Sequence, residues 1–134
     1  MNPNQIAIPV DVRPDEIARK QTLGAAIELC AELGGHSLDK TLQQALEVDK
    51  AQFSRWQNGT EGILWPKLVR LMDACGNDAP ILWMVHQRGF DLYAMRRRES
   101  ELEQELRQAK EKIRQMEHDR AVEIRALREV RALA

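Results

Sequence analysis

The sequence has few of the features that mark membrane, secreted or metal-dependent proteins. No apolar run approaches the roughly 18 residues that a membrane span needs. The first fourteen residues lack the basic start and long apolar core of a signal peptide. The 2 cysteines and 3 histidines are scattered without metal-ligand spacing. We therefore expect a cytoplasmic protein that does not contact a membrane and binds no metal or cofactor.

Motifs that carry catalytic chemistry are missing as well. The chain contains no glycine-rich phosphate loop, no nucleophile elbow and no CxxC pair. Cys30 and Cys75 each fall on the apolar side of an expected helix, where intracellular proteins usually hold buried, reduced thiols. The sequence therefore gives no positive reason to expect an enzyme.

What remains is typical of a helical protein. Charged residues make up 31% of the chain and aromatic residues 4%, and most of the 7 glycines and 5 prolines stand where helices would begin or end. This pattern predicts an all-α fold. We expect an arm over residues 1–14, a compact five-helix domain over residues 15–90, and a long helix over residues 91–134.

The amino-terminal arm has an ambiguous pattern. Ile6, Ile8 and Val10 alternate with other residues, as in a short strand, but Pro9 would restrict such a strand to the edge of a sheet. A flexible arm is the default expectation. The alternative is a strand that pairs with a partner subunit.

Capping and turn residues delimit the five expected helices. Aspartate and serine favour helix starts, proline favours the first turn, and glycine favours helix ends. The expected limits are Asp15 and Leu33 for the first helix, Ser37 and Leu46 for the second, Asp49 and Asn58 for the third, Pro66 and Gly76 for the fourth, and Asp78 and Gly89 for the fifth.

The second and third expected helices form a recognisable pair. The segment from Asp39 to Gly59 reads DKTLQQALEVDKAQFSRWQNG, and five of its apolar residues have the spacing of two helices that pack across a tight turn. Asp49 would cap the third helix, with Gln52 three residues later as in a capping box. The residues expected to be buried are Leu42, Leu46, Val48, Phe53 and Trp56.

Burial of those residues leaves a polar outer face with the chemistry of a DNA reader. Gln52 suits a bidentate contact to adenine, and Lys50 or Arg55 suits guanine or phosphate. Small Ala51 permits close approach, and Asn58 suits a phosphate. The candidate DNA-binding residues are Lys50, Ala51, Gln52, Ser54, Arg55, Asn58 and Lys67. The alternative is an ordinary helix pair whose polar face is only solvated.

The segment VDKAQFSRW resembles the recognition segment of the CII-type transcriptional activators of lambdoid phages. Residues 38–72, about a quarter of the chain, resemble the helix-turn-helix of the lambda repressor/Cro superfamily. The resemblance implies a five-helix bundle, sequence-specific DNA binding through Lys50, Gln52, Arg55 and Asn58, oligomerisation, and a place in a phage or prophage regulatory circuit.

This chain departs from that family at two positions. Many members have alanine where Gln43 stands, because the two helices approach closely there. Many have glycine in the turn where Glu47 stands, so Glu47 is expected to adopt a left-handed or nearby conformation at some cost.

Residues 91–134 contain no glycine or proline and have an apolar seam that alternates between three- and four-residue steps. Such a seam predicts a coiled coil, parallel or antiparallel, that makes a dimer or tetramer. The alternative is a lone charged helix. Charged Glu99, Arg120 and Glu123 interrupt the seam. Its apolar residues are Leu92, Met95, Leu102, Leu106, Ala109, Ile113, Met116, Leu127, Val130 and Ala134.

The charge is divided unevenly along the chain. Residues 1–95 carry 9 Lys/Arg and 12 Asp/Glu, a net of −3, and residues 96–134 carry 11 and 9, a net of +2. The RRR run at residues 96–98 suits the solvated flank of a coiled coil or, alternatively, a phosphate contact.

Two functions therefore compete. The first is a DNA-binding transcriptional regulator that acts without catalysis, with double-stranded DNA, its own copies and RNA polymerase or another protein as candidate partners. The second is an adaptor protein that keeps the helix-turn-helix fold but binds proteins, which the acidic domain and the coiled coil favour.

Overall fold

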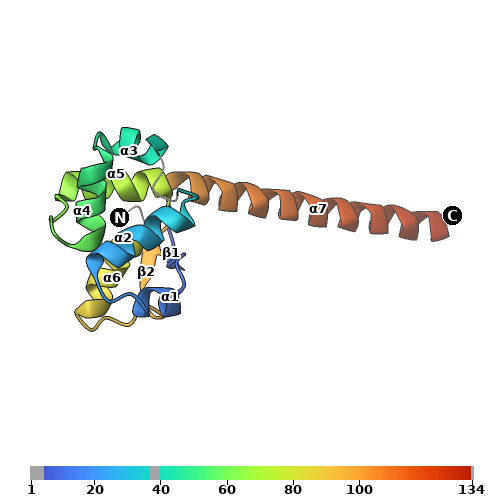
Figure 1. The fold of residues 1–134 in the computed structure, drawn as a ribbon. Helices are drawn as coiled ribbons and strands as arrows, with labels where there is room; N and C mark the ends of the chain where they lie inside the picture. The colour runs from blue at the N-terminus through green and yellow to red at the C-terminus, as the bar shows by residue number, and fades with distance from the viewer. Residues whose placement is uncertain (1–4, 37–39, 134) are drawn as a thin grey trace. The chain divides into compact units, whose positions relative to one another are not determined.

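The computed structural model describes residues 5–36 and 40–133. Within these ranges the chain is mostly helical, as expected, with seven helices and one two-stranded sheet (Figure 1). It divides into two units, one of residues 9–95 and one of residues 1–8 with 96–134. In the described part of the chain, no helix combines the length and the apolar character that crossing a bilayer requires.

The described residues of the 9–95 unit form six helices rather than five. The expectation of a single first helix from Asp15 to Leu33 is wrong, because the first helix ends at Ala18. Thr22 caps a second helix by accepting a hydrogen bond from the Ala25 N–H (3.0 Å). The helices are α1 (Pro14–Ala18), α2 (Leu23–Leu33), α3 (Lys40–Leu46), α4 (Lys50–Asn58), α5 (Trp65–Cys75) and α6 (Ala79–Gln87).

Several of the expected helix limits are confirmed. Asp49 caps α4, Gly59 ends it at φ 83°, Pro66 stands in the first turn of α5, and Gly76 ends α5 at φ 70°. Asp78 is wrong as a side-chain cap: the Asn77 Oδ1 accepts the Ala79 N–H instead (3.2 Å). The expected cap Ser37 and its neighbours Leu38 and Asp39 lie outside the described residues.

The core of this unit gathers apolar side chains from all six helices. Both cysteines are buried in it, as expected. Leu92 is 3% exposed there and Met95 packs against its edge, so their assignment to a coiled coil is wrong. The segment bends after α6 because the Asp91 carboxylate accepts the Tyr93 N–H (2.9 Å), and this turn directs Leu92 into the core. The most completely buried large side chains are Ile17, Ile27, Leu42, Leu46, Phe53 and Leu71.

The second unit contains a two-stranded sheet and one long helix. Strand β1 (Ala7–Pro9) pairs with strand β2 (Arg96–Arg98), so the arm forms a strand within its own chain and the expectation of a flexible arm is wrong there. The long helix, α7 (Glu101–Leu133), begins ten residues later than expected, because residues 96–98 are a strand (Figure 1).

Candidate nucleic-acid interface

The turn between α3 and α4 is held by backbone hydrogen bonds and one strained residue. The Glu47 N–H donates to the Gln44 carbonyl (3.1 Å) and the Val48 N–H to the Gln43 carbonyl (3.0 Å), which is the bond pattern of a Schellman helix end. This pattern needs a left-handed residue after the helix, and Glu47 supplies it at φ 56°. Among the described residues Glu47 alone has a positive φ without being glycine, so the expected strain is confirmed.

Helix α4 is anchored by its cap and by two aromatic side chains. The Asp49 carboxylate accepts the Gln52 N–H at 2.7 Å, which satisfies one of the unpaired donors at the start of the helix. Phe53 and Trp56 are 1% and 3% exposed, with ring centroids 6.0 Å apart and tilted by 58°. Leu42 and Leu46 of α3 are buried in the same cluster, so four of the five predicted inner residues are confirmed as buried. Val48, the fifth, is only half-buried and packs against the edge of the cluster.

A close approach of α2 to α4 sets the depth at which α4 packs. A Cβ added to Gly24 of α2 would lie 2.6 Å from the Gln57 carbonyl carbon and closer still to its oxygen. Glycine at this position therefore lets the two backbones meet. The sequence alone does not identify Gly24 in this role, because a glycine inside a helix does not by itself show which segment it approaches.

Five of the six predicted DNA-binding residues of α4 lie on the exposed side of the helix. Gln52 is half-buried, and the other five α4 positions predicted to bind DNA are exposed: Lys50, Ala51, Ser54, Arg55 and Asn58. The face opposite Phe53 and Trp56 therefore carries donors, acceptors and one small residue.

Two of these side chains have partners in the loop after α4. The Arg55 Nε donates to the Glu61 Oε2 at 3.0 Å, and both side chains are partly exposed. The Asn58 Oδ1 accepts from the Thr60 N–H (3.0 Å) and hydroxyl (2.8 Å). The ion pair lowers the net positive charge that Arg55 presents. The two Asn58 contacts use its side-chain oxygen and not its amide N–H groups.

Lys67, in the first turn of α5, has a structural contact. Its half-buried side chain donates from Nζ to the Leu46 carbonyl oxygen at 2.6 Å. A cation at the carboxyl end of α3 stabilises the exposed carbonyls there. The contact links α5 to the turn that precedes α4, and phosphate binding by Lys67 stays a prediction.

The charges are not spread evenly through the acidic unit. Residues 40–70 hold five Lys/Arg and three Asp/Glu, a net of +2, within a segment of residues 1–95 whose net is −3. All three acidic residues have local partners: Asp49 caps α4, Glu61 pairs with Arg55, and Glu47 pairs with Arg70 at 3.2 Å. The segment that carries the candidate interface is thus more basic than the rest of its unit.

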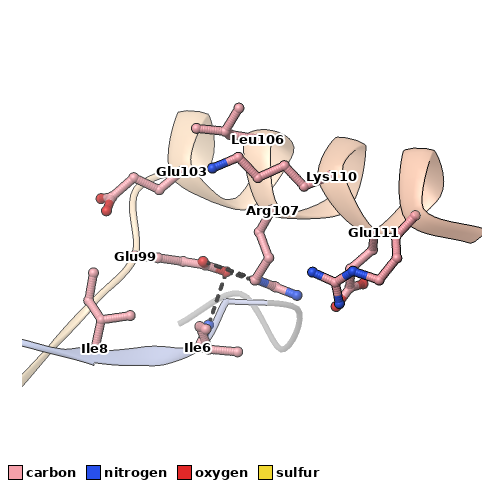
Figure 2. A pocket seen from close by; sticks show the side chains of 9 residues that line it. Ile6, Ile8, Glu99, Glu103, Leu106, Arg107, Lys110 and Glu111 are labelled. Carbon is pink, nitrogen blue, oxygen red and sulfur yellow. Dashed lines mark hydrogen bonds and ion pairs between the residues drawn. The ribbon is translucent and has the colours of Figure 1, made fainter.

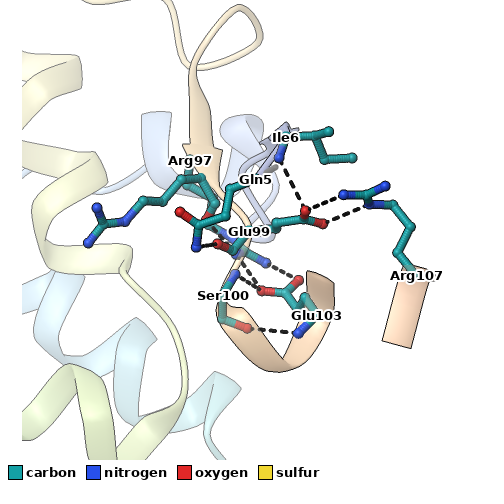
Figure 3. Close-up of polar contacts among 8 residues, drawn as sticks. Gln5, Ile6, Arg97, Glu99, Ser100, Glu103 and Arg107 are labelled. Atoms are coloured by element: carbon teal, nitrogen blue, oxygen red, sulfur yellow. Dashed lines mark hydrogen bonds and ion pairs between the residues drawn. The ribbon is translucent and has the colours of Figure 1, made fainter. Parts of the chain in front are cut away.

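The RRR run joins the sheet to α7 through a second capping arrangement (Figure 3). Arg97 donates two hydrogen bonds to Glu103 (2.8 and 3.0 Å), and Glu103 also accepts the Ser100 N–H (3.1 Å) while the Ser100 hydroxyl accepts the Glu103 N–H (3.1 Å). Chiefly because of the Arg97 hydrogen bonds, the pKa of Glu103 falls to about 2. The Ser100–x–x–Glu103 spacing is that of a capping box, a signal present in the sequence but not among the predictions above.

A buried carboxylate lies between β1 and α7. Glu99 is 2% exposed and accepts from the Arg107 Nη2 (2.8 Å), the Arg107 Nε (3.2 Å) and the Ile6 N–H (3.2 Å) (Figure 2). The Arg107 hydrogen bonds are the main cause that lowers the pKa of Glu99. Glu99 is therefore a junction residue, and not an interruption in a coiled-coil seam. Beside it Ile6, Ile8 and Leu106 line a groove of about 360 Å³.

Helix α7 exposes its apolar seam along its length. The exposed fraction ranges from 54% to 75% for the apolar seam residues Leu102, Leu106, Ile113, Met116, Leu127 and Val130, and Ala109 is also exposed. Ala134 lies outside the described residues. Comparisons of the chain with protein-family models, with curated proteins and with solved structures found no match.

Proposed function

We propose that this chain is a sequence-specific DNA-binding transcriptional regulator that uses α3 and α4 as a helix-turn-helix. One observation supports this above the others. The α3–α4 pair buries its four large apolar side chains, while α4 keeps a polar outer face next to a capped amino-terminal end. A helix presented in this way matches the width of a DNA major groove.

In this proposal the outer face of α4 reads base edges. Gln52 makes a bidentate contact to adenine, and Lys50 near the amino-terminal end of α4 contacts guanine or phosphate. Ser54 and Ala51 allow close approach, and the Asn58 amide donates to a phosphate. Lys67 supports the turn through Leu46 and lies in the segment of net positive charge.

Arg55 requires an exchange of partners. Its guanidinium faces Glu61 across 3.0 Å in a pair whose side chains are both partly exposed to water. Exposed pairs of this kind contribute only about 0–1 kcal/mol, so a phosphate or a guanine can replace Glu61 as the partner at small cost. The exchange also discriminates, because a site that offers Arg55 no acceptor leaves the ion pair in place.

The regulator would bind as an oligomer. One helix-turn-helix makes few base contacts, and proteins of this kind generally combine two on paired half-sites. The exposed apolar residues of α7 from Leu102 to Val130 supply a surface for pairing with a second copy. The origin in a phage or prophage rests on the resemblance of VDKAQFSRW to the CII-type activators.

Fluorescence anisotropy with genomic duplex fragments at two salt concentrations tests the proposal. We expect binding that weakens steeply with salt, and an Arg55→Ala loss of about 1–3 kcal/mol. Arg19→Ala is the matched control, because it removes the same charge from an exposed position outside residues 40–70. Absence of binding at low salt, or equal effects of the two variants, would overturn the proposal.

The acidic balance favours one second candidate. Residues 1–95 have a net charge of −3, and Glu61 already neutralises Arg55, as suits a helix-turn-helix domain that binds a protein. In that adaptor function the α4 face would contact a polypeptide. A stoichiometric protein partner that is lost with Arg55→Ala, together with no DNA binding, would favour the adaptor.

A further inference from the structure

The exposed seam of α7 has two opposite charges at its centre. Ile113 and Met116 precede them and Leu127 and Val130 follow them, each between 55% and 65% exposed. Arg120 and Glu123 occupy the intervening seam positions and are exposed as well. A helix that pairs through this seam must bring both charged side chains into its contact surface.

The spacing assigns each seam residue to one of two heptad positions. Steps of four and three residues place Ile113, Arg120 and Leu127 at one core position, and Met116, Glu123 and Val130 at the other. Parallel helices pack each core position against the same position of the partner, whereas antiparallel helices pack one core position against the other. The two orientations therefore give the charges different neighbours.

In a parallel pair each charged seam residue would face the same residue of the partner subunit, so like charges would face each other. Arg120 would face Arg120 of the partner subunit, and Glu123 would face Glu123 of the partner subunit, each in a contact layer partly shielded from water. Like charges that are brought together in an interface cost several kcal/mol. The flanking apolar layers would have to offset two such repulsions.

In an antiparallel pair the same residues are complementary. When Arg120 faces Glu123 of the partner subunit, the two-fold symmetry of the pair makes this contact twice. The same register places Met116 opposite Leu127 and Ile113 opposite Val130, again twice each. Every apolar layer then meets an apolar layer, and each charge meets an opposite charge.

We propose that α7 pairs with α7 of a second copy as an antiparallel coiled coil, in the register that places Arg120 against Glu123 of the partner subunit. The inference rests on the coiled-coil part of the proposed function and is independent of DNA binding. The symmetry axis passes between Ala121 and Val122. At 1.5 Å per residue, the amino-terminal ends of the two α7 helices lie about 60 Å apart along the coil.

The surroundings of Leu106 agree with this register. Leu106 lines the groove that it shares with Ile6 and Ile8 of its own chain (Figure 2). The first turns of α7 thus have neighbours within the same unit, and the proposed pairing uses the seam from Ile113 to Val130, where α7 is exposed on all sides.

Disulfide formation between full-length variants that each carry one added cysteine tests the orientation. Met116→Cys and Leu127→Cys are prepared separately, mixed in equal amounts and oxidised, and the cross-linked peptides are identified by mass spectrometry. We expect a 116–127 disulfide in the mixture and no dimer from either variant alone, because each added cysteine lies about 16 Å from its own copy along the coil. The wild type, with buried Cys30 and Cys75, gives the background. A 116–116 disulfide, or no 116–127 disulfide in the mixture, would overturn the proposal.

A charge reversal provides a second, non-covalent readout. Arg120→Glu should weaken self-association in sedimentation equilibrium by at least about tenfold, because it places a carboxylate instead of a guanidinium against Glu123 of the partner subunit. Arg125→Glu makes the same change outside the seam and should leave association unaltered. Equal effects of the two reversals would contradict the register. DNA anisotropy with Arg55→Ala is scored separately, so a wrong orientation and a failure to bind DNA are told apart.

Discussion

Gly24→Ala should destabilise the unit of residues 9–95, because it inserts a methyl group where α2 meets the backbone of α4. The added Cβ would lie 2.6 Å from the Gln57 carbonyl carbon and 3.0 Å from its Cα. Backbone atoms cannot move aside by a side-chain rotation, so the two helices must separate. Overpacking of this kind costs about 1–3 kcal/mol.

The helix preference of alanine opposes that cost. Replacing glycine by alanine inside a helix stabilises it by about 1 kcal/mol. A backbone clash belongs at the upper end of the overpacking range, so we expect a net loss of about 2 kcal/mol in the free energy of unfolding. For a small protein this shifts the urea midpoint by about 1 M.

Urea unfolding followed by tryptophan fluorescence measures this loss, since Trp56 is buried in the affected core. Gly62→Ala is the matched control, because a Cβ at Gly62 meets nothing within 4 Å and its φ is not positive. The control should change stability by no more than about 0.5 kcal/mol. Equal midpoints for the two variants would refute the argument that Gly24 sets the α2–α4 distance.

Three further predictions concern the turn, the α7 cap and the core. Glu47→Gly should stabilise the protein by about 0.5–1 kcal/mol in the same urea assay by removing left-handed strain, whereas Glu47→Ala, which keeps the strain, should give no gain. The Glu103 carboxylate should titrate near pH 2 in a carbon NMR experiment, and Arg97→Gln should raise that titration midpoint. Because the pKa of Glu103 is lowered in the folded state, the cap stabilises the fold above about pH 4.5 and loses this contribution as the pH falls toward 2. An unchanged Glu103 titration midpoint in Arg97→Gln would show that the Arg97 hydrogen bonds do not cause the lowered pKa. Leu92→Ala should lower the free energy of unfolding by about 2–5 kcal/mol in thermal or urea unfolding, while Leu102→Ala, at a side chain 75% exposed, should lower it far less. A larger loss for Leu102→Ala than for Leu92→Ala would place Leu92 outside the core.

Local signals explain what the sequence could predict about the α3–α4 pair. Asp49, Gly59 and Pro66 act within one helical turn of where they stand, and their positions agree with the structure. The apolar spacing of Phe53 and Trp56 predicted their burial because a helix places residues three apart on one side. These features determine which side chains of α4 remain on its outer face.

The features that escaped prediction depend on distant parts of the chain. Leu92 and Met95 continue the seam spacing of α7, but a spacing does not tell whether the surface that covers it belongs to the same unit or to another molecule. Gly24 matters only because Gln57 approaches it, and β1 forms only because Arg96–Arg98 lie beside it. The Arg55–Glu61 pair likewise depends on the path of the loop after α4.

In the proposed function, the outer face of α4 reads a base sequence. Selection from a random pool of duplex DNA, carried out in parallel with the full-length wild type and Gln52→Ala, tests it most directly. We predict that the wild type enriches a defined sequence, and that Gln52→Ala loses the preference at one adenine-containing base pair while it keeps the others. An unenriched pool for the wild type, or an identical sequence for both proteins, would contradict the assignment of α4 as the reading helix.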